Sequence, residues 1–185
     1  SDELKSYAGA NRWQMISASE AKLSTATGTA IGQIIGFEVL TGTGTDTLTG
    51  AEGTNRWVVT SAGRGTLNAQ TAFDGFANLA GNSGADTFAF GLAGTVAQVT
   101  GGEGTDSLAA RTSENQWNFS ANDRGTINSL GADNYVSFSG VEQFTGATLA
   151  NDRITLAPQV TQVQLKAGGQ EGDEPAPGHQ WKKCR

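Results

Sequence analysis

The sequence predicts an all-β protein built as a parallel β-helix, a β-solenoid in which short strands stack on one another in successive coils. Three observations indicate this fold. The chain contains irregular internal repeats, its apolar residues alternate with polar ones over short stretches, and Gly, Asn and Asp bound those stretches. One repeat of this kind cannot bury its own apolar face, so the repeats must stack. A β-sandwich of repeated hairpins is the alternative fold.

Each repeat opens with an Asn-x-Trp sequence and closes with an Asp followed two residues later by an apolar residue. An Arg-Gly-Thr block follows Trp57 and Trp117 at the same distance, beginning at Arg64 and Arg124. These copies divide the chain. We predict a leader over residues 1–10, a repeat domain over 11–166 with units at about 11–50, 55–109 and 115–156, and a disordered tail over 167–185.

The strands are expected in chain order from the alternation of apolar and polar residues. In the first unit Trp13 and Met15 alternate with polar Gln14, and residues 31–40 form one or two short strands. The second and third units repeat the opening strand at their own Trp. Residues 160–165 alternate in the same way and form a last strand.

The second unit carries an additional closing motif. Asp86 and Asp106 are 20 residues apart, and the closing Asp precedes the next Trp by 11 residues both for Asp46 and Trp57 and for Asp106 and Trp117. Because solenoids grow by whole coils, we interpret the surplus of this unit as one extra coil.

Composition excludes several classes of protein. The net charge is −6, which argues against a nucleic-acid partner, and the absence of a run of about 18 apolar residues argues against membrane insertion. The chain has one Cys, so it cannot form a disulfide within itself. Gly accounts for 26 of 185 residues and Pro for 3, which indicates many tight turns.

The closing motif carries a resemblance to a known family. Residues 101–109, Gly-Gly-Glu-Gly-Thr-Asp-Ser-Leu-Ala, match the nonapeptide G-G-x-G-x-D-x-U-x in full, and residues 41–49 and 81–89 each differ at one position. The chain resembles the RTX-like and haemagglutinin-like repeats of large bacterial surface or secreted exoproteins. This resemblance implies an extracellular or bacterial cell-surface location and a structural or adhesive role.

The same resemblance implies a calcium site. In RTX arrays the Asp and glycine carbonyl groups of neighbouring turns enclose Ca²⁺, a hard cation that prefers oxygen ligands. The residues that match this motif one coil apart are Asp86, Asp106, Gly84 and Gly104. The alternative is that each Asp caps its own turn by accepting backbone N–H groups.

Two sets of repeated residues are candidate ligand sites. Trp57 and Trp117 could form an aromatic strip that binds sugars, or a ladder within the core. Arg64 and Arg124 occupy equivalent turns and are either a ligand clamp or solvated turn residues. No nucleophile, base and acid form a recognisable set, and the only His, His179, lies in the predicted tail, so we do not expect an enzyme.

The sequence therefore supports three functions. The first is a structural and adhesive repeat segment of a bacterial surface or secreted exoprotein. The second is a carbohydrate-binding or carbohydrate-active β-helix. The third is a self-assembling filament subunit, because the ends of a solenoid present free strand edges. The expected partners are surface glycans of a host or the environment, other exoprotein segments, or further copies of this chain.

Overall fold

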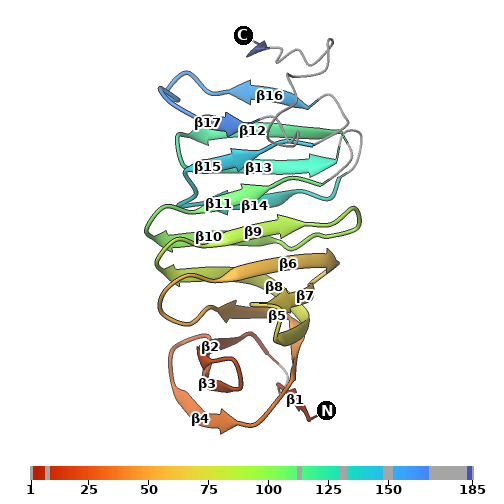
Figure 1. The fold of residues 1–185 in the computed structure, drawn as a ribbon, viewed down its shortest axis with the longest axis vertical. Helices are drawn as coiled ribbons and strands as arrows, with labels where there is room; N and C mark the ends of the chain where they lie inside the picture. The colour runs from red at the N-terminus through yellow and green to blue at the C-terminus, as the bar shows by residue number, and fades with distance from the viewer. Residues whose placement is uncertain are drawn as a thin grey trace.

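A computed structural model describes residues 2–6, 9–111, 114–129, 133–147 and 152–166, together with the backbone of 183–184. These residues form strands, turns and loops, and they contain no helix. The strands lie across the long axis of the molecule and follow one another along it, from the N-terminal end at the bottom of Figure 1 to the C-terminal end at the top. The predicted all-β class is confirmed.

The strands fall into three groups along the chain. The first group is β1 (Glu3–Lys5), β2 (Asn11–Ser17), β3 (Glu20–Thr25), β4 (Ala30–Ile35) and β5 (Val39–Thr49). The second is β6 (Arg56–Ser61), β7 (Arg64–Leu67), β8 (Thr71–Ser83), β9 (Thr87–Phe90), β10 (Gln98–Glu103) and β11 (Ser107–Ala109). The third is β12 (Asn115–Ala121), β13 (Arg124–Ser129), β14 (Val136–Ser139), β15 (Gln143–Thr145), β16 (Arg153–Leu156), β17 (Gln164–Lys166) and β18 (Lys183–Cys184).

In the part of the chain that the structure describes, antiparallel pairing occurs at one place in each repeat. The strand that carries the Trp forms a hairpin with the next strand, and that strand pairs with a third. These trios are β2–β3–β4, β6–β7–β8 and β12–β13–β14. The remaining pairings are parallel and join segments far apart in the chain, as in β5–β8–β10–β14 and β9–β11–β15–β17.

The sheet is therefore mixed, and the finer prediction of a parallel β-helix is not confirmed. The physical reason lies in the turns after the Trp strands. Only two residues separate β6 from β7, and a strand that returns after so short a turn must run antiparallel to its predecessor. Gly63 in that turn has φ +63°, which favours glycine. The hairpins of the alternative fold are thus present, but within one 18-stranded sheet.

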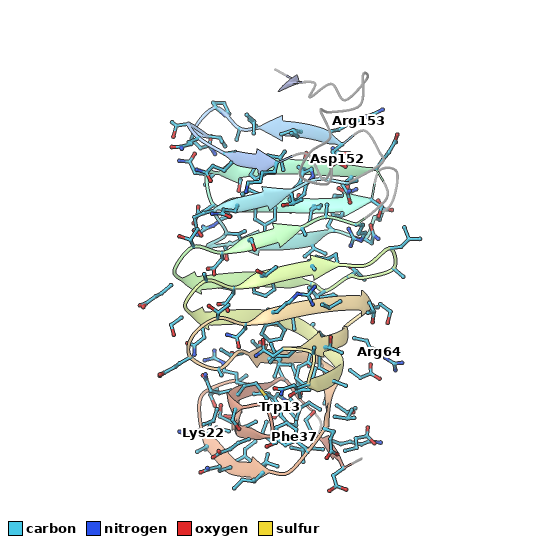
Figure 2. All side chains as sticks on the ribbon, viewed as in Figure 1. Trp13, Lys22, Phe37, Arg64, Asp152 and Arg153 are labelled. Atoms are coloured by element: carbon cyan, nitrogen blue, oxygen red, sulfur yellow. The ribbon has the colours of Figure 1, made fainter. Side chains whose placement is uncertain are left out.

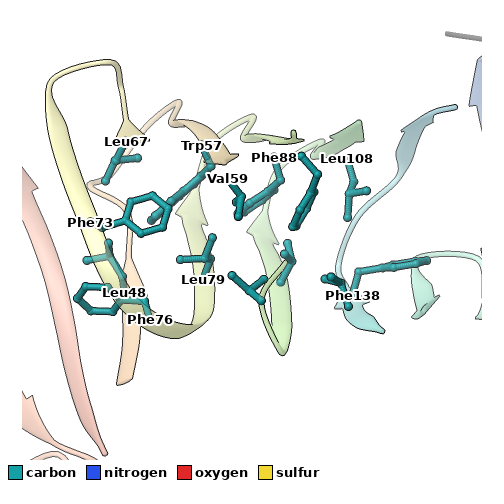
Figure 3. Close-up of a cluster of buried hydrophobic side chains, with 14 of the residues drawn as sticks. Leu48, Trp57, Val59, Leu67, Phe73, Phe76, Leu79, Phe88, Leu108 and Phe138 are labelled. Carbon is teal, nitrogen blue, oxygen red and sulfur yellow. The ribbon is translucent and has the colours of Figure 1, made fainter. Parts of the chain in front are cut away.

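Two rows of apolar side chains fill the interior. One row comes from the stack β5–β8–β10–β14 and the other from β6–β9–β11–β15, and they face each other across the core (Figure 3). In the first row Leu48, Leu79, Val99 and Phe138 are in register. In the second row the register is Trp57, Phe88, Leu108 and Phe144.

The same register places residues 20 positions apart side by side, because Phe88 pairs with Leu108 and Leu79 with Val99. This agrees with the interpretation of the surplus in the second unit as one additional layer. Aromatic pairs stabilise the core. The Trp57 and Phe88 rings stack with their centroids 5.7 Å apart, and the Trp117 and Phe144 rings meet edge to face with their centroids 5.6 Å apart. Such pairs contribute about 0.5–1.5 kcal/mol beyond the burial of their area.

The two ends of the chain differ in detail from expectation. In the predicted leader, β1 pairs in parallel with β5, so this segment adds a strand to the sheet. The predicted last strand at residues 160–165 is shorter and later, at Gln164–Lys166. Of the predicted disordered tail, the structure describes only Lys183–Cys184, which pair with β16; the rest, including His179, lies outside the described residues.

Candidate functional site

Three junctions of the same design connect the start of a hairpin to the strand that stacks on it. In each, an Asn lies two residues before the hairpin Trp, and an Asp lies two residues before the apolar residue with which that Trp is in register. We call these the Asn–Asp junctions. Their pairs are Asn11–Asp46, Asn55–Asp86 and Asn115–Asp152.

Every Asn–Asp junction contains the same two hydrogen bonds. The backbone N–H of the Asn donates to Oδ1 of the Asp at 2.9, 2.6 and 2.8 Å in chain order. The side-chain Nδ2 of the same Asn donates to the same oxygen at 3.3, 2.9 and 3.0 Å. The three Asp residues are at most 6% exposed. A carboxylate this deeply buried needs donors, and the Asn supplies them.

The junctions differ at the second carboxylate oxygen. Oδ2 of Asp46 accepts the indole Nε1–H of Trp13 at 2.9 Å, and Oδ2 of Asp152 accepts the backbone N–H of Ala147 at 2.8 Å. Oδ2 of Asp86 has no donor among the described residues, and the indole nitrogen of Trp57 has no acceptor there. The indole nitrogen of Trp117 at the third junction also has no acceptor in the described part of the chain, so what distinguishes the middle junction is its unpaired carboxylate oxygen.

The two Gly-Asp turns of the second unit stack directly on each other, as their 20-residue spacing predicts. Gly102 is in register with Asn82, and the backbone N–H of Asp86 donates to Oδ1 of Asp106 at 2.7 Å. The next step repeats this arrangement, since the N–H of Asp106 donates to Oε2 of Glu142 at 2.9 Å. Three acidic side chains thus form a ladder, and each of them receives the backbone N–H of the layer before it.

Glycine is required where these carboxylates fold back against their own turns. A Cβ on Gly101 would collide with Oδ2 of Asp106 and with the carbonyl oxygen of Gly140. A Cβ on Gly81 would collide with Oδ2 of Asp86 and with the carbonyl oxygen of Gly101. The first Gly of the closing motif therefore leaves room for the Asp that ends it.

Burial and hydrogen bonding shift the pKa values of the acids in opposite directions. Burial raises the pKa of Asp86 and of Asp106, and the negative charge of the next acid in the ladder raises each further. For Asp46 burial also acts to raise the pKa. The hydrogen bonds from Trp13, Thr43 and Asn11 outweigh it, and the pKa of Asp46 is lowered.

The predicted calcium ligands occupy these stacked turns. Asp86 and Asp106 are 1% and 0% exposed, and Gly84 and Gly104 adopt φ values of +94° and +124°. Oδ1 of each Asp accepts backbone N–H groups, while each Oδ2 has no donor in the described part of the chain. The oxygen donors suit Ca²⁺ in kind. Within the described ranges no three His, Cys, Asp or Glu side chains converge to hold a metal. The calcium site stays a prediction.

The Trp residues predicted as a sugar-binding strip lie inside the fold. Trp57 and Trp117 are both 0% exposed, and each packs face to face with a Phe. Trp13 is also fully buried and lies within the lower part of the molecule in Figure 2. This is the arrangement that the core-ladder interpretation predicts.

The equivalent Arg residues have different surroundings. Arg64 extends outward from the fold (Figure 2) and forms an ion pair with Asp74. Arg124 is exposed, lines a surface hollow and has no ion-pair partner among the residues that the structure describes. The sequence does not distinguish the two, because Asp74 is contributed by a different strand.

Arg111 is a residue that sequence reasoning missed. Its side chain is 0% exposed, its Nε donates to the carbonyl oxygen of Gly94 at 2.8 Å, and its guanidinium lies 5.6 Å from the centre of the Phe90 ring. Burial lowers the pKa of Arg111. The other two guanidinium nitrogens have no acceptor among the described residues. The repeats contain no equivalent Arg, so they carry no signal for it.

Comparison with models of known families, with curated proteins and with solved structures finds no match to this chain. The RTX-like resemblance therefore rests on the motif residues alone. Among the described residues there is no helix of the length and apolar character needed to cross a membrane.

Proposed function

We propose that the chain is a structural and adhesive segment of a bacterial surface or secreted exoprotein, with a solenoid-like body. The observation that carries this proposal is the Asn–Asp junction, which recurs three times with the same two hydrogen bonds. Each junction fastens one hairpin to a strand 31–37 residues further along the chain. A design that repeats its joints in this way extends by adding units.

The burial of the recurring polar side chains favours a structural role over catalysis. The repeated polar residues face the interior and are used to hold backbone groups, whereas catalytic groups must reach a substrate. The Trp and Asp that recur in each unit therefore stabilise the fold. This arrangement suits a scaffold, whose function is to hold its outer faces in place for contact with a partner.

Force spectroscopy tests this role directly. The chain is placed between two copies of a reference domain of known unfolding force, and the molecule is pulled by its ends. A scaffold is expected to unfold at a force comparable to that of the reference and in steps that correspond to repeat units. Extension without a measurable force peak would contradict the proposal.

Calcium stabilisation is a second proposal, favoured by the two unpaired carboxylate oxygens of Asp86 and Asp106. A cation there would offset the burial of two neighbouring negative charges. Millimolar Ca²⁺ should then raise the midpoint of thermal unfolding above that in chelator, because a ligand of the native state stabilises it. If Ca²⁺ no longer raises the unfolding midpoint of Asp106→Asn, the calcium site lies at this turn. The same midpoint in both conditions would leave both Asp residues as turn caps.

Self-assembly is favoured by the surface of β4. Among the described residues this strand pairs only with β3, and two of its apolar residues, Ile31 and Ile35, are 50% and 72% exposed. A free strand edge with apolar side chains is a template for pairing with another chain. Sedimentation velocity should show association that grows with concentration and is lost in Ile35→Lys. A native chain that stays monomeric at all concentrations would exclude this edge as an assembly surface.

A further inference from the structure

One outward face of the sheet forms a continuous polar surface. The strands along it are β2, β5, β8, β10, β14, β13, β12 and β16, each paired with the next. The residues in register on this face are all hydrophilic: Arg12, Thr47, Asn78, Gln98, Ser137, Thr126, Asn118 and Thr155. With strands roughly 4.8 Å apart, the row is on the order of 34 Å long.

Three surface hollows lie end to end along this row. The first, of about 1050 Å³, lies over β2, β3 and β4; the second, of about 330 Å³, over β5, β8 and β10; the third, of about 800 Å³, over β12, β13 and β14. Neighbouring hollows share lining residues. Arg12 and Thr49 line the first and the second, and Gln98 lines the second and the third. We call the combined feature the polar groove.

The hydrogen-bonding groups of the polar groove suit a polyhydroxylated chain. Amide and hydroxyl side chains of the row line the second and third hollows, and these groups both donate and accept hydrogen bonds. The first hollow mixes Gln14, Ser24 and Gln33 with apolar residues such as Met15 and Ile16, which suit the apolar faces of sugar rings. The exposed aromatic side chains on which nucleic-acid bases stack are missing from its lining. The three hollows follow one another over eight strands, and a site this long fits a linear polymer better than a compact small molecule.

The charges of the polar groove differ in sign from those of the whole protein. Its charged lining residues are Arg12, Lys22 and Arg124, with Glu52 as the only acid, whereas the chain as a whole carries −6. Neither Arg12 nor Arg124 has an ion-pair partner among the described residues. A guanidinium group binds a carboxylate through two parallel hydrogen bonds, so these two residues are suited to carboxylates on a ligand.

We propose that the polar groove binds a linear acidic polysaccharide, whose uronate carboxylates contact Arg12 and Arg124 and whose hydroxyl groups contact the amide and hydroxyl side chains between them. This binding supplies the adhesive part of the function proposed above and rests on it. The site differs from the Trp residues that the sequence suggested for sugar binding, since those are buried. It uses the outer face of the sheet instead.

The chain offers a matched control for each Arg. Arg56 occupies the same Asn-Arg-Trp position as Arg12 and is also exposed, but it lines none of the three hollows. Arg64 begins the same Arg-Gly-Thr block as Arg124 and is already paired with Asp74. All four residues are exposed, so their substitution by Gln should leave the fold intact.

The experiment measures affinity for polygalacturonate of defined length by calorimetry, with dextran and a single-stranded thymidine oligonucleotide as comparison polymers. The native chain should bind polygalacturonate, bind dextran and the oligonucleotide at least tenfold more weakly, and lose affinity as ionic strength rises. The double variant Arg12→Gln/Arg124→Gln should lose about tenfold in affinity, and Arg56→Gln/Arg64→Gln should stay within about twofold of the native chain.

A second variant tests the middle of the polar groove. Gln98→Glu places a negative charge where the second and third hollows meet and should weaken binding, whereas Gln164→Glu on the exposed β17 should not. Equal losses in both double Arg variants, equal binding of the oligonucleotide, equal binding of dextran, or no binding of polygalacturonate would each overturn the proposal. Because force spectroscopy needs no ligand, a failure here leaves the scaffold role to be judged separately.

Discussion

At the scale of single residues, the molecule is organised by buried polar groups as much as by apolar ones. The Asp of each closing motif lies in the interior and holds backbone N–H groups of a neighbouring layer. In the two closing motifs of the second unit, Gly81 and Gly101 leave the space that the carboxylate occupies. The buried position of the Asp in these motifs therefore depends on the Gly, because any larger residue there would clash with the carboxylate.

Substitution at Gly101 tests this dependence. Gly101→Ala places a methyl group against Asp106 and the Gly140 carbonyl, so it should lower the free energy of unfolding by about 1–3 kcal/mol, the usual cost of overpacking. Gly32→Ala is the control, because nothing lies within 4 Å of its Cβ position. Denaturant titration of both variants gives the answer. Equal stability of the two would show that the turn yields without cost.

The opposite pKa shifts of Asp106 and Asp46 predict opposite effects of neutralisation. The raised pKa of Asp106 means that the folded state binds its proton more tightly, so the stability linked to this group is present at acid pH and lost as pH rises through the folded value. Asp106→Asn should therefore stabilise the protein at neutral pH, and the gain should vanish below about pH 4.

The lowered pKa of Asp46 gives the reverse result. Its contribution is present above the unfolded value and is lost as pH falls through the folded value. Asp46→Asn should destabilise the protein at neutral pH, with a loss that shrinks in acid. Thermal unfolding of both variants across the pH range measures the two trends. Trends of the same sign would contradict the environments described for these carboxylates.

At the scale of elements, the Asn–Asp junctions decide which strands meet. The hairpin strands β2, β6 and β12 each pair in parallel with residues that directly follow an Asp, and the junction fixes the register of that pairing. The polar contact is specific in a way that apolar stacking is not, since a shift by one residue would leave a buried carboxylate without its donors.

Removal of the Asn side chain from one junction tests this role. Asn55→Ala deletes the Nδ2 donor of Asp86 together with its bonds to the carbonyl oxygens of Ala51, Gly53 and Gly81. The free energy of unfolding should fall by roughly 2–3 kcal/mol. Asn78→Ala, which removes one long bond at the surface, should change it by less than about 0.5 kcal/mol. If Asn55→Ala lowers the free energy of unfolding no more than Asn78→Ala does, the junction does not stabilise the strand pairing.

The sequence predicted much of this element structure. The 20-residue interval between Asp86 and Asp106 agrees with the register of β8 with β10 and of β9 with β11, and the unit boundaries stay a prediction. The antiparallel hairpins were predicted only as part of the alternative fold. The two-residue turn at 122–123 contains no glycine and the turn at 62–63 contains only Gly63, so neither turn identifies a hairpin from sequence.

The candidate sites were harder to predict than the strands. Alternation shows that Trp57 and Trp117 belong to strands, but both core and sugar-binding residues alternate, and only the structure shows the rings inside. The pairing of Asn55 with Asp86 was missed because it joins residues 31 positions apart. The polar groove was missed because its row is assembled from eight strands that are not in chain order.

At the scale of the whole molecule, the strands are paired in successive layers, and we predict that a whole layer can be removed. Strand β8 pairs with β10, which pairs with β14, and β9 pairs with β11, which pairs with β15. Residues 87–106 contain β9 and β10 and end at the Asp that is equivalent to Asp86. Their removal joins Asp86 to Ser107 and presents β8 to β14 and β6 to β11 with Leu79 facing Phe138 and Trp57 facing Leu108. It also removes Gly94 and Phe90, which contact the buried Arg111, so the shortened chain should be less stable.

The most direct test of this account is the unfolding of the chain that lacks residues 87–106. We predict that it folds, keeps the near-ultraviolet circular dichroism of buried Trp residues, and unfolds in one cooperative transition with a lower midpoint than the native chain. The chain that lacks only residues 97–106 breaks the layer and should be unfolded. A collapsed or unfolded product from the 87–106 deletion, or equal tolerance of both deletions, would contradict the layered architecture proposed here.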